Sequence, residues 1–121
     1  RWALCMSGLY DISRFVNGFS GDDLYFSNPM AYAPNLHGEH LDRVRRHAHL
    51  VLVCGRGKWE DSNLDDTVAF SEVLASKGIS HERDVWGHDV HHEWPWWRRQ
   101  LRYHVDRFLA RCQVAGGGQS A

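Results

Sequence analysis

Two clusters of ionisable side chains each follow a strand-like run of the sequence, and together they could carry out acid–base chemistry. The first cluster, Glu60 and Asp61, comes shortly after the apolar run 49–54. The second cluster follows the run 81–86 and contains His88, Asp89, His91, His92 and Glu93. A carboxylate that orients an imidazole allows that imidazole to act as a general base toward a nucleophile. The two clusters therefore predict the acid and the histidine of a catalytic triad.

The elements that must position these clusters are three strands. Residues 49–54 (His-Leu-Val-Leu-Val-Cys) form a continuous apolar run, typical of a parallel strand that is covered on both faces. Residues 2–7 predict a second apolar strand, and the more polar run 81–86 predicts a strand nearer the edge of the sheet. Strands that alternate with helices indicate an α/β fold with a parallel sheet. In such sheets chemistry takes place beyond the carboxyl ends of the strands, where both clusters fall.

The helices are predicted from apolar spacing and from capping residues. Asp11 is expected to cap a helix over 11–19, and Ser62 or Asn63 to cap a helix over 64–77. A short helix is expected over 41–46, and an irregular excursion over 20–40. A long helix is expected over 94–111, with an apolar stripe of Leu101, Val105, Phe108 and Leu109. Residues 113–121 end in Gly-Gly-Gly-Gln-Ser-Ala and predict a disordered tail.

A nucleophile is missing from this pattern. In α/β-hydrolases the serine precedes the acid and the histidine and lies on a Gly-x-Ser-x-Gly turn, and that motif does not occur in this sequence. Ser7 lies in Cys-Met-Ser-Gly, and we interpret it as a residue at the end of a strand. Because the sequence opens inside a core strand, we expect a piece of a larger domain whose upstream half carries the serine.

Two segments carry a resemblance to a known family. Residues 55–61 read Gly-Arg-Gly-Lys-Trp-Glu-Asp, and residues 86–97 read Trp-Gly-His-Asp-Val-His-His-Glu-Trp-Pro-Trp-Trp. Together with 6–11 and 25–30 they resemble the esterase family that includes S-formylglutathione hydrolases, mycolyltransferases and enterochelin esterases. The likeness is greatest to a bacterial branch of uncharacterised esterases, with Glu93 in place of the aspartate usual there. The long second segment is the specific one, and the resemblance spans residues 2–109.

The resemblance implies that residues 1–112 are the C-terminal part of an α/β-hydrolase domain. His92 aligns with the catalytic histidine of the family. Glu60 aligns with the triad acid, and Asp61 competes for that role because a loop tolerates a slip of one residue. The implied activity is hydrolysis of carboxylic esters through an acyl-enzyme, or acyl transfer, without a cofactor and with no metal. The implied partners are a small-molecule ester, the missing upstream half of the domain and a second copy in a homo-oligomer.

The composition excludes several other classes of function. The 121 residues are 43% hydrophobic with a formal net charge of −1, which favours neither nucleic acid nor a membrane surface as a partner. No apolar run reaches the ~18 residues of a membrane span. The three widely spaced cysteines predict reduced structural thiols and a cytoplasmic protein.

Two other functions compete with the esterase. One is a non-catalytic, hydrolase-like module that only binds partners. The other is a metal site in the 88–93 cluster, although Gly87 and Pro95 disfavour the helix that would bring His88 and His92 together. Trp94, Trp96 and Trp97 follow the cluster, and they either dock the last helix or form a wall for an acyl or aromatic group.

Overall fold

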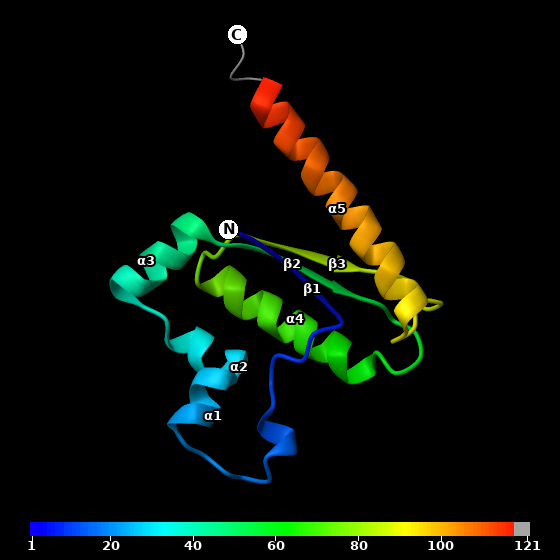
Figure 1. Cartoon of the computed structure of the whole chain (residues 1–121). Helices are drawn as coiled ribbons and strands as arrows, with labels where there is room; N and C mark the ends of the chain where they lie inside the picture. The colour runs from blue at the N-terminus through cyan, green and yellow to red at the C-terminus, as the bar shows by residue number, and fades with distance from the viewer. Residues whose placement is uncertain (118–121) are drawn as a thin grey trace.

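The computed structural model describes residues 1–117, which form a three-stranded parallel sheet between helices (Figure 1). The strands are β1 (Trp2–Met6), β2 (His49–Cys54) and β3 (His81–Val85). The helices are α1 (Asp22–Ser27), α2 (Pro29–Tyr32), α3 (Gly38–His47), α4 (Asp61–Ser76) and α5 (Trp94–Gly117), with 3-10 turns at Ser13–Phe15 and Ala33–Asn35. In the described part of the chain, no helix is both long enough and apolar enough to cross a membrane.

The strand order β1-β2-β3 confirms the predicted parallel sheet. β2 lies in the centre, with Leu4 opposite Val51 on one side and Val51 opposite Glu82 on the other. Leu52 and Val53 of β2 are fully buried, as expected for a strand covered on both faces. The more polar β3 lies at one edge, as its sequence predicts, and β1 forms the opposite edge.

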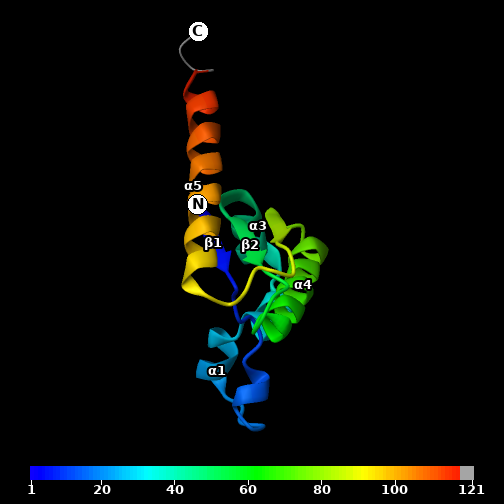
Figure 2. The same ribbon diagram turned by 90° about the vertical axis from the view of Figure 1, so that its right-hand side faces the viewer.

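Helices cover both faces of the sheet. Figure 2 shows α5 on one side of the strands and α4 on the other. The main core lies on the α4 side, where the rings of Tyr10 and Phe70 stack at 4.6 Å over the buried Leu52. On the other side, Phe108 of α5 packs against Trp2 with ring centroids 4.7 Å apart. The second half of α5 extends past the sheet (Figure 1).

The helix predicted over 11–19 is wrong, because only Ser13–Phe15 forms a helical turn. Long-range hydrogen bonds hold the segment in a loop conformation instead. The Asp66 carboxylate accepts the backbone N–H groups of Tyr10 (2.9 Å) and Asp11 (3.0 Å), and the Asp11 carboxylate accepts the N–H of Ser13. The hydrogen bonds from Ser13 lower the pKa of the Asp11 carboxyl. Residues 20–40, expected to be irregular, contain α1, α2 and the start of α3.

The expected stripe on α5 is correct only at Phe108, which packs against Trp2, and wrong at its other three members. Leu101, Val105 and Leu109 are exposed by 46%, 36% and 51%, whereas His104 is only 2% exposed. The reason lies in β3, whose acidic side chains face α5: His104 Nε2 lies 2.8 Å from Asp84. A similar pair joins Arg107 to Glu82 farther along the helix. These polar contacts set the rotation of the helix about its axis.

The ends of two helices differ from the sequence prediction. α4 begins at Asp61, earlier than residue 64, and the structure shows no side-chain cap for it. Asn63 bonds instead to the backbone oxygens of Ser7 and Gly8 at 3.0 and 3.3 Å. The helix ends at Ser76, where Gly78 adopts a φ of 64°, as Lys77-Gly78 predicts. α5 continues through Gly117, so residues 113–117 of the predicted tail are helical, and 118–121 lie outside the described residues.

Candidate active site

The loops that follow β2 and β3 lie side by side and are joined through their backbones. Arg56 N–H donates to the oxygen of Gly87 at 3.1 Å, and His92 N–H donates to the oxygen of Lys58 at 2.9 Å. A side chain at Gly55 would collide with the backbone of Val90, so this approach requires glycine. Parallel strand ends therefore bring the two predicted clusters to one edge of the sheet.

Two residues at this edge adopt a backbone conformation that is unfavourable for their type. Ser7 has a φ of 49° and Trp59 has a φ of 68°, both in the left-handed region. Such strain persists only where neighbouring contacts enforce it, and it concentrates at functional sites. Ser7 follows β1 directly, and Trp59 precedes Glu60.

Glu60 is the most deeply buried carboxylate of this site, with a side chain that is 1% exposed. Its Oε1 accepts the hydroxyl of Ser7 at 2.8 Å, and its Oε2 accepts the thiol of Cys54 at 2.8 Å. Burial raises the pKa of the Cys54 thiol, so the thiol stays protonated and remains a donor. A buried carboxylate without such donors would be strongly disfavoured.

His92 faces this carboxylate from the neighbouring loop. Its Nδ1 lies 3.3 Å from Glu60 Oε1, but the alignment does not make a hydrogen bond, and the buried Nδ1 has no other partner among residues 1–117. The imidazole side chain is 35% exposed, and its ring meets the edge of Trp97 at a centroid distance of 4.7 Å. Hydrogen bonds in a catalytic site are often loose before substrate binds, so this contact is compatible with acid–base chemistry.

The structure distinguishes the two candidate acids by position. Asp61 is the first residue of α4 and is exposed, whereas Glu60 lies beneath it against His92. A carboxylate at the first turn of a helix is favoured by the helix dipole, which gives Asp61 a structural role. Of the two predicted carboxylates, only Glu60 is brought to the histidine.

The other members of the second cluster do not converge. His91 Nδ1 accepts the backbone N–H of Lys58 at 2.7 Å, which ties the two loops together. The backbone oxygen of Glu93 accepts the N–H groups of Trp96 and Trp97 at the start of α5. Within residues 1–117, no three or more His, Cys, Asp or Glu side chains come together as a metal site.

Sequence reasoning missed two residues that contact Glu60. The sequence predicts Ser7 as a residue at the end of a strand and Cys54 as a reduced structural thiol, yet both donate hydrogen bonds to the Glu60 carboxylate. Trp97, which is predicted either to dock the last helix or to form a wall for an acyl or aromatic group, donates its indole N–H to Ser7 Oγ at 3.0 Å. The position of Ser7 and Cys54 at the carboxyl ends of neighbouring strands was the signal that could have identified them.

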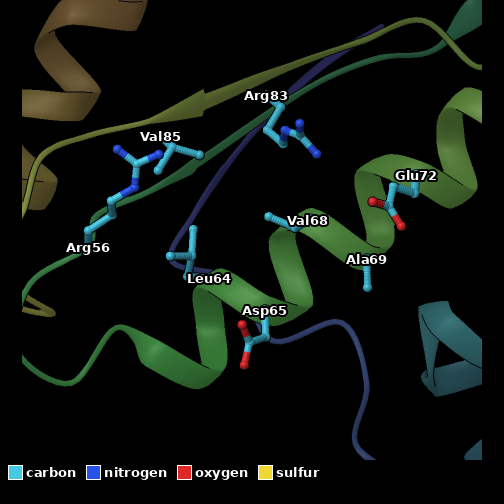
Figure 3. Close-up of a pocket in the computed structure, with 8 residues that line it drawn as sticks. All are labelled: Arg56, Leu64, Asp65, Val68, Ala69, Glu72, Arg83 and Val85. Carbon is cyan, nitrogen blue, oxygen red and sulfur yellow. The ribbon is translucent and has the colours of Figure 1, made fainter.

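A separate groove of about 350 Å³ lies between β3 and α4. Figure 3 shows Arg56 and Arg83 on the strand side of this groove and Asp65 and Glu72 on α4. Neither Glu60 nor His92 lines it, so it is distinct from the site at the strand ends.

Comparison with known proteins identifies no relative of this chain. No protein-family model, no curated protein and no solved structure matches this chain. The class that the residues themselves define is an α/β protein with a buried carboxylate and a histidine on neighbouring strand-end loops.

Proposed function

We propose that this chain contributes the acid and the histidine of a serine-esterase catalytic triad. The observation that carries the proposal is the contact between Glu60 Oε1 and His92 Nδ1 at the carboxyl ends of two adjacent parallel strands. In this role Glu60 holds the imidazole with its proton on Nδ1. Nε2 is then free to take a proton from a serine and to return it to the leaving group.

The nucleophile in this proposal lies outside these 121 residues. Ser7 is not proposed for that role, because its hydroxyl donates to the carboxylate of Glu60 rather than to the imidazole and accepts from Trp97. We therefore propose that residues 1–112 are the C-terminal part of an α/β-hydrolase domain. The upstream part would supply the serine and the oxyanion hole.

The reaction we propose is acyl transfer from a small carboxylic ester through an acyl-enzyme, to water or to another acceptor. It uses no cofactor. The three cysteines are free, which suits a reducing compartment, and we propose the cytoplasm.

A fluorophosphonate probe tests this proposal, because it labels a serine whose hydroxyl a neighbouring base activates. In the complete protein that carries this chain, we expect one labelled serine upstream of residue 1, and no labelling after His92→Ala. Labelling that persists in His92→Ala, or that is absent from the folded wild-type protein, would contradict the proposal.

A second candidate, a non-catalytic interaction module, is favoured by the exposed apolar surface. Phe19 and Phe26 are each 71% exposed, and β1 has no strand on its outer side within residues 1–117. Free strand edges and apolar patches promote association with other chains. This candidate also includes self-association into a homo-oligomer, and an upstream sequence without an activated serine would support it.

A further inference from the structure

We infer that Ser7 and Cys54 are positioning residues that aim the Glu60 carboxylate at His92, and that Trp97 links Ser7 to His92. This inference rests on the proposed function, since it assigns a role to residues that surround the proposed acid. The sequence predicts neither Ser7 nor Cys54 as a residue of the site.

Ser7 and Cys54 fix the carboxylate at both of its oxygens. Ser7 Oγ donates to Oε1 and Cys54 Sγ donates to Oε2, each at 2.8 Å. The carboxyl group can rotate about its terminal bond only by losing one of these contacts. Since that rotation is otherwise broad and soft, the two donors determine which lone pair faces His92.

Both donors are neutral, which leaves the negative charge of Glu60 for the histidine. Among residues 1–117, the ion-pair partner of Glu60 is His92, and no lysine or arginine lies within ion-pair distance of it. A cationic neighbour would compete with the imidazolium that forms during catalysis. A hydroxyl and a thiol satisfy the buried oxygens without that competition.

Ser7 is itself held from three directions. Its N–H donates to Val53 at 2.7 Å, its carbonyl accepts the side chain of Asn63, and its hydroxyl accepts Trp97 Nε1. These contacts enforce the left-handed φ of 49° that points the hydroxyl at Glu60. Because both its backbone and its hydroxyl are held in place, Ser7 can donate in one fixed direction.

Trp97 contacts both partners of the proposed pair. Its indole N–H bonds to Ser7, and its ring meets the His92 ring at 4.7 Å, nearly perpendicular. Trp97 of α5 therefore sets the position of both His92 and Ser7, the residue whose hydroxyl donates to the Glu60 carboxylate.

The test uses p-nitrophenyl acetate and the complete protein that carries this chain, with five variants at Ser7, Cys54 and Cys112 and with His92→Ala as the control for the proposed function. Ser7→Ala and Ser7→Gly both remove the hydroxyl, but glycine also relieves the left-handed strain and preserves folding. Cys54→Ala removes the thiol donor, and Cys54→Ser restores a donor at the same place. The exposed Cys112→Ala is the matched thiol control.

We expect both Ser7 variants to lower kcat roughly 10- to 100-fold with KM within about twofold, because one bond to a charged group is lost. Cys54→Ala should fall about tenfold, Cys54→Ser should recover most of that loss, and Cys112→Ala should match the wild type. In ¹⁵N-histidine spectra of the resting protein, we expect the wild type to show the Nδ1–H tautomer of His92 and the Ser7 variants to lose it.

Two outcomes overturn the inference, and a third overturns its premise. If Ser7→Gly keeps wild-type kcat and the same tautomer, or if Cys54→Ser is as impaired as Cys54→Ala, these residues do not position Glu60. Loss of activity in His92→Ala alongside either result would leave the proposed function standing. Full activity of His92→Ala would refute the proposed function itself.

Discussion

Replacing Glu60 by glutamine exchanges one buried carboxylate oxygen for an NH₂ group. Its effect on activity should show whether Glu60 or the neighbouring Asp61 is the acid. Glu60 is 1% exposed and accepts donors at both oxygens. A glutamine amide can accept at one oxygen only, so its NH₂ group must face the Ser7 hydroxyl, the Cys54 thiol or His92 Nδ1. In the last case the imidazole has to accept at Nδ1, which places its proton on Nε2 and removes the general base.

The expected loss of kcat follows from this wrong tautomer of His92. We expect Glu60→Gln to lower kcat for p-nitrophenyl acetate by more than ~10²-fold, which is about 2.7 kcal/mol of transition-state stabilisation. The fold should also lose about 1–3 kcal/mol, since one buried donor is left unsatisfied. Steady-state kinetics of the complete protein and urea unfolding measure the two effects.

Asp61→Asn is the matched control, because it makes the same chemical change at the exposed neighbour. Its kcat should stay within about threefold of the wild type, as expected for a surface substitution. A severe Asp61→Asn and a mild Glu60→Gln would show that the acid is misassigned. Two mild variants would refute the acid–histidine pair as the basis of activity.

Three further predictions concern the fold. His104→Ala should lower the free energy of unfolding by about 2 kcal/mol or more, measured in urea, because it empties a buried site and leaves Asp84 with Trp86 as its remaining partner; a loss below 0.5 kcal/mol would contradict this. Arg107→Ala should destabilise the protein more at pH 7 than at pH 3, because Arg107 lowers the pKa of Glu82. A lowered pKa gives stability that is present above the unfolded value near ~4.3 and is lost as the pH falls through the folded value, so equal losses at both pH values would refute the pairing. The 121-residue chain alone should self-associate through its free β1 edge and the exposed face of α5, and Leu109→Lys should weaken this in sedimentation; a monodisperse wild-type monomer would count against it.

The sequence predicted the strands and their parallel arrangement in one sheet, because these depend on local patterns. The apolar run 49–54 identified the central strand, and alternation of strands with helices identified the parallel sheet. The meeting of Glu60 with His92 then follows from a general property of such sheets, whose carboxyl ends share one edge. Their catalytic role stays a prediction.

Other features depend on long-range contacts that the local pattern does not contain. The choice between Glu60 and Asp61 is set by where α4 begins, and nothing in the loop specifies that residue. The rotation of α5 is set by the pairing of His104 with a strand residue twenty positions earlier. The loop at 11–19 is fixed by Asp66, which lies 55 residues from Asp11 along the chain. Each is a tertiary contact that overrides local spacing.

The most direct test of the account is ester turnover by His92→Ala in the complete protein. Since triad members act as a unit, we expect a loss of roughly 10⁴-fold or more in kcat for p-nitrophenyl acetate. His88→Ala and His91→Ala should stay within about tenfold of the wild type, because they move the imidazole only slightly. Turnover that survives in His92→Ala would contradict the account. It would equally be contradicted if His88→Ala were as damaging and the wild-type activity were lost to a chelator and restored by zinc.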